Sequence, residues 1–143
     1  MARDYKELGE LSGVQANMEV VREAYRRLDA GDADGFFDAF AEDMMSYDAE
    51  GIPYGGVYEG KSAFRLLSDK MFGAWESVRW NLLELSGGGN LVVVHLLLTF
   101  TPRGGEPFDH LILEQWRFRG GKAVEIRPFY YDTKLIAEKL TAR

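Results

Sequence analysis

The second half of the chain contains four extended segments joined by very short turns, and this feature limits the possible folds most strongly. The segments cover about residues 77–86, 91–101, 107–119 and 122–131, and "GGGN", "PRGG" and "GG" separate them. Turns of this length join antiparallel neighbours, whereas a parallel crossover needs a dozen residues or more. This half therefore predicts an antiparallel meander.

The first half has helical periodicity instead. Apolar residues recur there at alternating steps of four and three, at Val14, Met18, Val21, Tyr25 and Leu28. This stripe predicts an amphipathic helix, and Ser12 and Gln15 before it have the spacing of a capping box. Asp32 is placed to cap a second helix, "ADGFFDAFAED", over residues 33–43. A short strand over 44–48 and a glycine-rich loop follow.

A third helix is predicted by a second apolar stripe, formed by Phe64, Leu67, Met71 and Trp75. A last helix over "TKLIAEKL" closes the chain, with Asp132 as its expected N-cap. Helices followed by a meander indicate an α+β fold, in which a cone-shaped, curled antiparallel β-sheet packs against the N-terminal α-helices. We expect residues 1–12 to be an N-terminal extension and residues 13–143 to form a single domain.

Composition narrows the possible functions. The chain of 143 residues has 17 Lys and Arg against 23 Asp and Glu, a formal net charge of −6, which disfavours nucleic-acid binding. There is no cysteine, so thiolate chemistry and cysteine metal sites are excluded. No apolar run is long enough to span a membrane, and the first residues lack the apolar segment of a signal peptide. The expected location is cytoplasmic.

Two carboxylates in extended segments are the candidate chemical groups. Glu114 shares one face of its strand with apolar residues by period two, so it is expected on the inner face. There a carboxylate must be paired, hydrogen-bonded or protonated, and Arg117, Arg127 or His110 could supply a structural ion pair. Asp48 ends the strand before the glycine-rich loop, where it either hydrogen-bonds loop amides or faces a cavity. Two carboxylates in unequal environments can serve as base and acid.

Residues 14–131 resemble the nuclear-transport-factor-2-like superfamily, most closely its ketosteroid-isomerase and SnoaL-like branches. The resemblance lies in "VVREAYRRLDAGDADGFFDAFAEDMMSYD", "YEGKSAFR" and "LEQWRFRGGKAVEIRPFYYD". It implies a cone with a pocket. It leaves the activity open, because the superfamily includes isomerases, cyclases, hydrolases, lyases, dehydratases and binding modules.

The resemblance also implies roles for single residues. Asp48 falls on the general base of ketosteroid isomerase, and Glu114 falls on the protonated acid that binds the dienolate oxygen. The tyrosine of the first helix, which would complete the oxyanion site, corresponds to Ala24. Tyr25 is the next residue and is kept as a candidate for the oxyanion site or for substrate binding, although one helical step turns it by about 100°. Steroid isomerisation itself is therefore not expected.

Other side chains are candidates for the missing donor or for substrate binding. Tyr130 is the preferred substitute for the tyrosine, and Tyr54 and Tyr58 in the loop are further donors. His110 lies two residues from Glu114 on the same face, and Trp116 is an aromatic candidate for the wall. His95, His110, Asp109 and Glu114 have no metal-ligand spacing, so neither a metal nor a cofactor is expected.

These observations predict an enzyme without cofactor that transfers a proton on a bulky apolar or aromatic substrate, as an isomerase, lyase or cyclase. Elimination, retro-aldol cleavage and epoxide hydrolysis remain open, although the Asp-Arg-Asp arrangement of epoxide-hydrolysing relatives is not visible. The alternative is a non-catalytic module that binds a hydrophobic ligand or dimerises. In each case we expect a homodimer through the outer sheet face.

Overall fold

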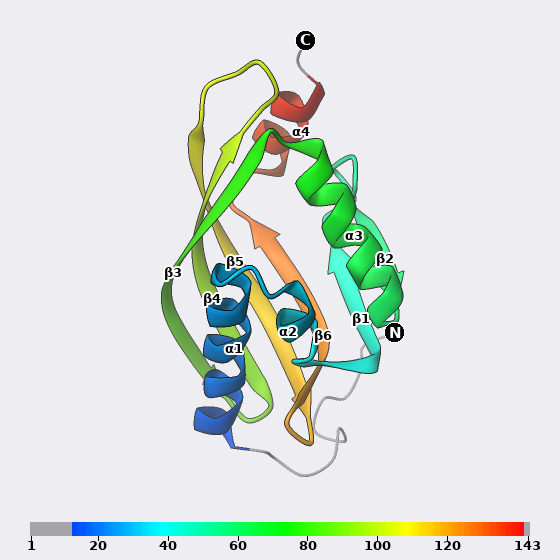
Figure 1. Cartoon of the computed structure of the whole chain (residues 1–143), viewed down its shortest axis with the longest axis vertical. Coiled ribbons are helices and arrows are strands. Elements are labelled where there is room, and N and C mark those ends of the chain that lie inside the picture. Colours follow the sequence, from blue (N-terminus) through cyan, green and yellow to red (C-terminus); the bar gives the residue numbers. More distant parts are fainter. Residues whose placement is uncertain (1–12, 142–143) are drawn as a thin grey trace.

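The structure is a computed structural model that describes residues 13–141 (Figure 1). Its elements are α1 (Val14–Asp29), α2 (Ala33–Phe37), β1 (Phe40–Asp48), β2 (Gly56–Glu59), α3 (Lys61–Ala74), β3 (Ser77–Gly88), β4 (Leu91–Thr101), β5 (Phe108–Arg119), β6 (Lys122–Tyr130) and α4 (Thr133–Thr141). The predicted α+β class is confirmed. The expected extension, residues 1–12, lies outside the described residues.

One mixed sheet of six strands forms the body of the fold, in the order β2-β1-β6-β5-β4-β3. The four C-terminal strands form the predicted antiparallel meander. β1, however, pairs parallel to β6, so the sheet is mixed and not antiparallel throughout. Figure 1 shows α1 and α2 on one face of the curled sheet, with α3 beside β1 and β2. The helices thus close one side of a cone.

Alternation along the strands decides which side chains face the helices. On β5, His110, Ile112, Trp116 and Phe118 are buried, whereas Leu111 and Leu113 are exposed. β4 has the same strict alternation of buried and half-buried residues. The inner face predicted from the period of two is therefore confirmed, and Glu114 lies on it.

The region before the meander departs from the sequence prediction. α2 ends at Phe37 instead of residue 43, and β1 starts at Phe40 instead of residue 44. Phe40 pairs with Ala123, and a register shift separates it from Met45. Pairing with β6 and burial of Phe40 outweigh the local helical pattern here, so the expected end of the second helix was wrong. The loop also contains a strand, β2, that the glycine-rich sequence did not indicate.

Helix caps follow the sequence more closely. Asp32 accepts a hydrogen bond from the Gly35 amide at 2.9 Å and caps α2, as predicted. Asp132 likewise accepts from the Leu135 amide at 3.0 Å at the start of α4. The N-cap position of α1 is Gly13, whose φ of 85° favours glycine. Ser12 of the predicted capping box lies outside the described residues.

A buried carboxylate, Glu125 of β6, lies on the face of the sheet that turns away from the helices. Its side chain is 1% exposed, and Arg117 and Arg127 form ion pairs with it at 3.9 and 3.6 Å. Gln115 donates a further hydrogen bond at 3.0 Å. The arginines that sequence analysis offered to Glu114 therefore pair with a different acid on the opposite face.

Replacing Glu125 with Gln should lower the free energy of unfolding by about 2 kcal/mol or more, because two partly buried guanidinium groups lose their anion. Urea unfolding followed by circular dichroism measures this loss. Glu84→Gln is the matched control, since Glu84 is 74% exposed and should change stability by less than about 0.5 kcal/mol. Equal effects of the two substitutions would contradict the structural role of Glu125.

Candidate active site

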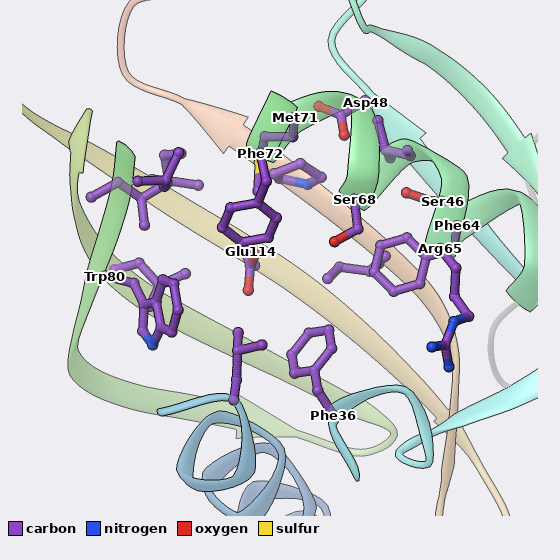
Figure 2. Close-up of a pocket in the computed structure, with 18 of the residues that line it drawn as sticks. Phe36, Ser46, Asp48, Phe64, Arg65, Ser68, Met71, Phe72, Trp80 and Glu114 are labelled. Atoms are coloured by element: carbon purple, nitrogen blue, oxygen red, sulfur yellow. The ribbon is translucent and has the colours of Figure 1, made fainter. Parts of the chain in front are cut away.

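A cavity of about 280 Å³ lies between the inner sheet face and the helices. Its walls are mainly apolar, with aromatic rings from α2, α3 and β3 (Figure 2). The lining residues used below are Tyr25, Ser46, Asp48, Arg65, Asp69, Phe72, Trp80, Glu114 and Tyr130. The volume is at the small end of the range of ligand sites, about 300–1,000 Å³. Trp116, Phe118 and Phe100 are fully buried but do not fill this space.

Asp48 reaches the cavity from the end of β1. Met44, Ser46 and Asp48 share the inner face of this strand, and Asp48 is half-buried. Its Oδ1 atom is buried and has no hydrogen-bond partner among the described residues. Burial and the negative charge of Glu114 raise the pKa of Asp48 to about 7, against a hydrogen bond from Ala49 that lowers it. Asp48 therefore faces a cavity and is more than a loop-capping residue.

Glu114 reaches the same cavity from β5. Its Oε1 accepts a hydrogen bond from the Tyr25 hydroxyl and another, at 3.1 Å, from Trp116 Nε1. Burial raises the pKa of Glu114, and these two hydrogen bonds act in the opposite direction. The carboxyl groups of Asp48 and Glu114 are close enough for one charge to raise the pKa of the other. Sequence analysis paired Asp48 with Glu114, and the fold places both side chains at the same cavity.

Tyr25 corrects the argument from helical spacing. Counting residues placed Ala24 at the site and turned Tyr25 away, but Tyr25 lines the cavity and donates to Glu114. Its place in the apolar stripe of α1, which packs on the sheet, explains this position. Burial, followed by the charge of Glu114 and the hydrogen bond to it, raises the pKa of Tyr25 well above 10.

The three other candidate tyrosines are Tyr130 at the cavity, Tyr54 in the loop before β2, and Tyr58 on β2. Tyr130 lines the cavity, and burial, with the charge of Asp48 as the next cause, raises its pKa well above 10. Tyr54 is buried behind it, hydrogen-bonds to Tyr130 and accepts from Trp75 Nε1 at 3.3 Å. Tyr58 donates to the Tyr54 carbonyl at 2.8 Å. Tyr54 and Tyr58 are not among the lining residues, so they hold the loop in place.

His110 and Trp116 have supporting positions. His110 is buried, and its Nε2 accepts the Asp132 amide at 3.1 Å, which ties β5 to the start of α4. Burial lowers the pKa of His110, against the charge of Asp132, so the neutral ring is favoured. Neither His110 nor Trp116 is among the lining residues, although Trp116 contacts Glu114 directly.

Sequence analysis did not single out two groups of site residues. Ser46 is 1% exposed, lines the cavity, and its Oγ has no hydrogen-bond partner among the described residues. Its position two residues before Asp48 was the available signal. At the wall formed by α3 and β3, the rings of Phe72 and Trp80 lie 6.2 Å apart, and Trp80 donates to Asp29 at 2.5 Å. The two rings come from consecutive elements, α3 and β3, but helical and extended periodicity do not show that their side chains meet.

Residues 13–141 contain no group of three His, Asp or Glu side chains placed to hold a metal ion. Within the same residues, no helix has the length and apolar character needed to cross a membrane.

A curled sheet closed by helices around a small, largely apolar cavity defines a small-molecule-binding cone fold. The model of the SnoaL-like domain family matches residues 21–126, and the chain belongs to this family. The resemblance to the nuclear-transport-factor-2-like superfamily is thereby confirmed.

Solved structures agree with this assignment of the fold. An NTF2-like protein of unknown function from Burkholderia pseudomallei is 26% identical, with a TM-score of 0.82 over 89% of this chain and 98% of that chain. TerC, co-crystallised with polyporic acid, is 21% identical, with a TM-score of 0.81 over 89% and 99%. A putative SnoaL-like polyketide cyclase from Jannaschia sp. CCS1 is 17% identical, with a TM-score of 0.76 over 94% and 99%. No curated protein matches the sequence.

The raised pKa of Asp48 has a consequence for stability. The folded state keeps its proton up to about pH 7, whereas the unfolded chain loses it near the ordinary value of 3.8. Between these values the unfolded chain binds fewer protons, so this contribution to stability is present in acid and is lost as the pH rises towards 7.

The Asp48→Asn substitution should remove the loss of folding stability that occurs as the pH rises towards 7. We expect the stability of the variant relative to wild type to rise by on the order of 2 kcal/mol between pH 4.5 and pH 8, as measured by urea unfolding at several pH values. Asp109→Asn, an exposed acid on the outer face of β5, should follow the wild-type pH dependence. Parallel curves for wild type and Asp48→Asn would show that Asp48 ionises normally.

Proposed function

We propose that this protein is an enzyme without cofactor that transfers protons on an apolar or aromatic carbonyl compound, as an isomerase, lyase or cyclase. The observation that carries the proposal is the meeting of Asp48 and Glu114, from two separate strands, in one cavity. One of them has a pKa of about 7, where a group can both give and take a proton at neutral pH. The proposal keeps the expectations that the protein uses no metal or cofactor and binds neither nucleic acid nor membranes. It also keeps the expected cytoplasmic location.

The walls of the cavity support an apolar or aromatic substrate. Phe36, Phe64 and Phe72 contribute rings, and Leu96, Ile112 and Ile126 contribute aliphatic surface. Such walls exclude water, and proton transfer between a carboxylate and carbon is strengthened by a site of low polarity. The size of the cavity favours a compact molecule over a large polycyclic one.

The second candidate is a module that binds a hydrophobic ligand without turning it over. The observation in its favour is the same ring-lined cavity, together with the co-crystal of TerC with polyporic acid. A binding module needs the walls but has no need for a pair of carboxyl groups with raised pKa values. The two candidates therefore differ in the effect of removing those groups.

The test is a panel of cyclic enones, hydroxylated aromatics and polyporic acid, with turnover followed by absorbance and binding by calorimetry. Asp48→Asn and Glu114→Gln should each lower kcat/KM by about 10²- to 10⁴-fold, the usual contribution of a positioned acid or base. Asp109→Asn on the outer face of β5 should retain wild-type activity.

Two outcomes count against catalysis by this pair. Turnover that survives both Asp48→Asn and Glu114→Gln would refute the assignment of the residues. Tight binding of a panel compound with no turnover by wild type would favour the binding module.

We also propose that the protein forms a homodimer through the outer sheet face. Three apolar side chains on this face, Leu111, Leu113 and Phe129, are 42%, 44% and 53% exposed. They come from the adjacent strands β5 and β6, and Leu113 pairs directly with Phe129. A contiguous exposed apolar patch of this kind is typical of an interface.

Size-exclusion chromatography with light scattering should therefore give about twice the chain mass of 16.2 kDa. Leu113→Glu should shift the mass to that of the monomer, because a charge would enter the apolar interface. Leu66→Glu on α3 is the control, since Leu66 is 52% exposed and lies away from this face. A wild-type protein that elutes as a stable monomer would contradict the proposal.

A further inference from the structure

The two carboxyl groups of the cavity, Glu114 and Asp48, differ in the hydrogen-bond donors that surround them. Glu114 has two donors, the Tyr25 hydroxyl and Trp116 Nε1, and both bonds end on Oε1. Among residues 13–141, no hydrogen bond ends on Oε2 of Glu114. Donors that point at a carboxylate stabilise its charged form. These donors offset part of the desolvation that raises the pKa of Glu114, while its second oxygen stays available to a ligand.

Asp48 is surrounded differently. The Ala49 amide donates a hydrogen bond to its carboxyl group, but Oδ1 is buried without a partner among residues 13–141. The Oγ of Ser46, two residues earlier on the same face of β1, is in the same position. A buried polar atom without a partner is costly, and an ionised oxygen costs more than a protonated one. A protonated Asp48 and the Ser46 hydroxyl would together offer two donors to an oxygen atom in the cavity. Figure 2 shows both side chains on one side of the cavity and Glu114 near its centre.

Among residues 13–141, neither acid forms an ion pair with a cation. The titratable and charged groups at the cavity or behind it, by element, are Tyr25 on α1, Arg65 and Asp69 on α3, Tyr54 in the loop before β2, and Tyr130 on β6. Arg127 of β6 lines a second cavity together with Asp48, but it pairs with Glu125 at 3.6 Å. The tyrosines are neutral at physiological pH because their pKa values are raised. Arg65 pairs with Asp34 at 2.6 Å. Two close acids without a cation share one proton, and hydrogen bonding decides which acid keeps it.

We propose that Glu114 is the ionised proton acceptor of this site, and that Asp48 keeps the shared proton and, with Ser46, binds the carbonyl oxygen of the substrate. This reverses the roles that the family resemblance implies for the two acids. It rests on the proposed function and defines its substrate class, a carbonyl compound with an acidic C–H near the carbonyl group. The carbonyl oxygen would face β1, and the C–H would face β5.

The proton transfer balances without an oxidant or co-reactant. The C–H bond breaks as an O–H bond forms on Glu114, and the electron pair of the C–H bond becomes the C=C bond of an enolate. The electrons of the C=O bond move to oxygen, which Ser46 and Asp48 stabilise by hydrogen bonds or by transfer of the Asp48 proton. Return of the proton from Glu114 to another carbon completes an isomerisation, and loss of a leaving group completes an elimination.

The decisive experiment measures the ionisation of Glu114 without using activity. The indole N–H of Trp116 donates to Glu114, so its ¹H–¹⁵N signal reports the charge on that carboxyl group. The chain has only three tryptophans, and Trp116→Phe assigns the signal. In a titration of wild type from pH 4 to pH 9, the main step of this signal should come at a lower pH than the step caused by Asp48. A smaller step near pH 7, caused by Asp48, should disappear in Asp48→Asn.

Control variants separate the possible outcomes. Asp109→Asn on the outer face should leave both steps unchanged. A main step at a higher pH than the Asp48 step in wild type, or a step near pH 7 that persists in Asp48→Asn, would overturn the proposed roles. The titration does not depend on finding a substrate. Tight binding of a panel compound without turnover would count against the enzyme, while the titration still decides which acid holds the charge.

Discussion

The hydrogen bonds from Tyr25 and Trp116 to Glu114 are the interactions on which the rest of the site depends. A carboxyl group on the inner face of an apolar sheet has a high desolvation cost, and two neutral donors offset part of it. Because Tyr25 belongs to α1 and Trp116 to β5, the same bonds connect the first helix to the middle of the sheet. The cavity is the space that this connection leaves between the elements.

Much of the fold follows from the period of the sequence. Four strands with short glycine turns can only form a meander, and alternation along β5 places Glu114 inside and Arg117 outside. The apolar stripe of α1 identifies the side chains that pack on the sheet, and Tyr25 is one of them. Sequence reasoning identified both carboxyl groups because each lies in a strand whose inner face is clear from its neighbours.

The parts that could not be read from the sequence depend on contacts between distant segments. Residues 38–43 carry a helical pattern, yet Phe40 pairs with Ala123 of β6, and this pairing draws the segment into a strand. The contact between Tyr25 and Glu114 joins residues 89 positions apart, and a count of residues along the helix could not establish it. The free oxygens of Ser46 and Asp48 are equally hidden, because a missing partner is a property of the packed interior.

The two faces of the sheet show how the surroundings of a carboxyl group determine its use. On the outer face Glu125 is fixed by ion pairs with Arg117 and Arg127 and by a hydrogen bond from Gln115. On the inner face Glu114 has neutral donors only, which stabilise its charge without removing its affinity for a proton. Adjacent strands thus carry one acid suited to structure and one suited to proton transfer. The difference arises from alternation, since residues 115 and 117 face outward while 114 and 116 lie on the inner face of the sheet.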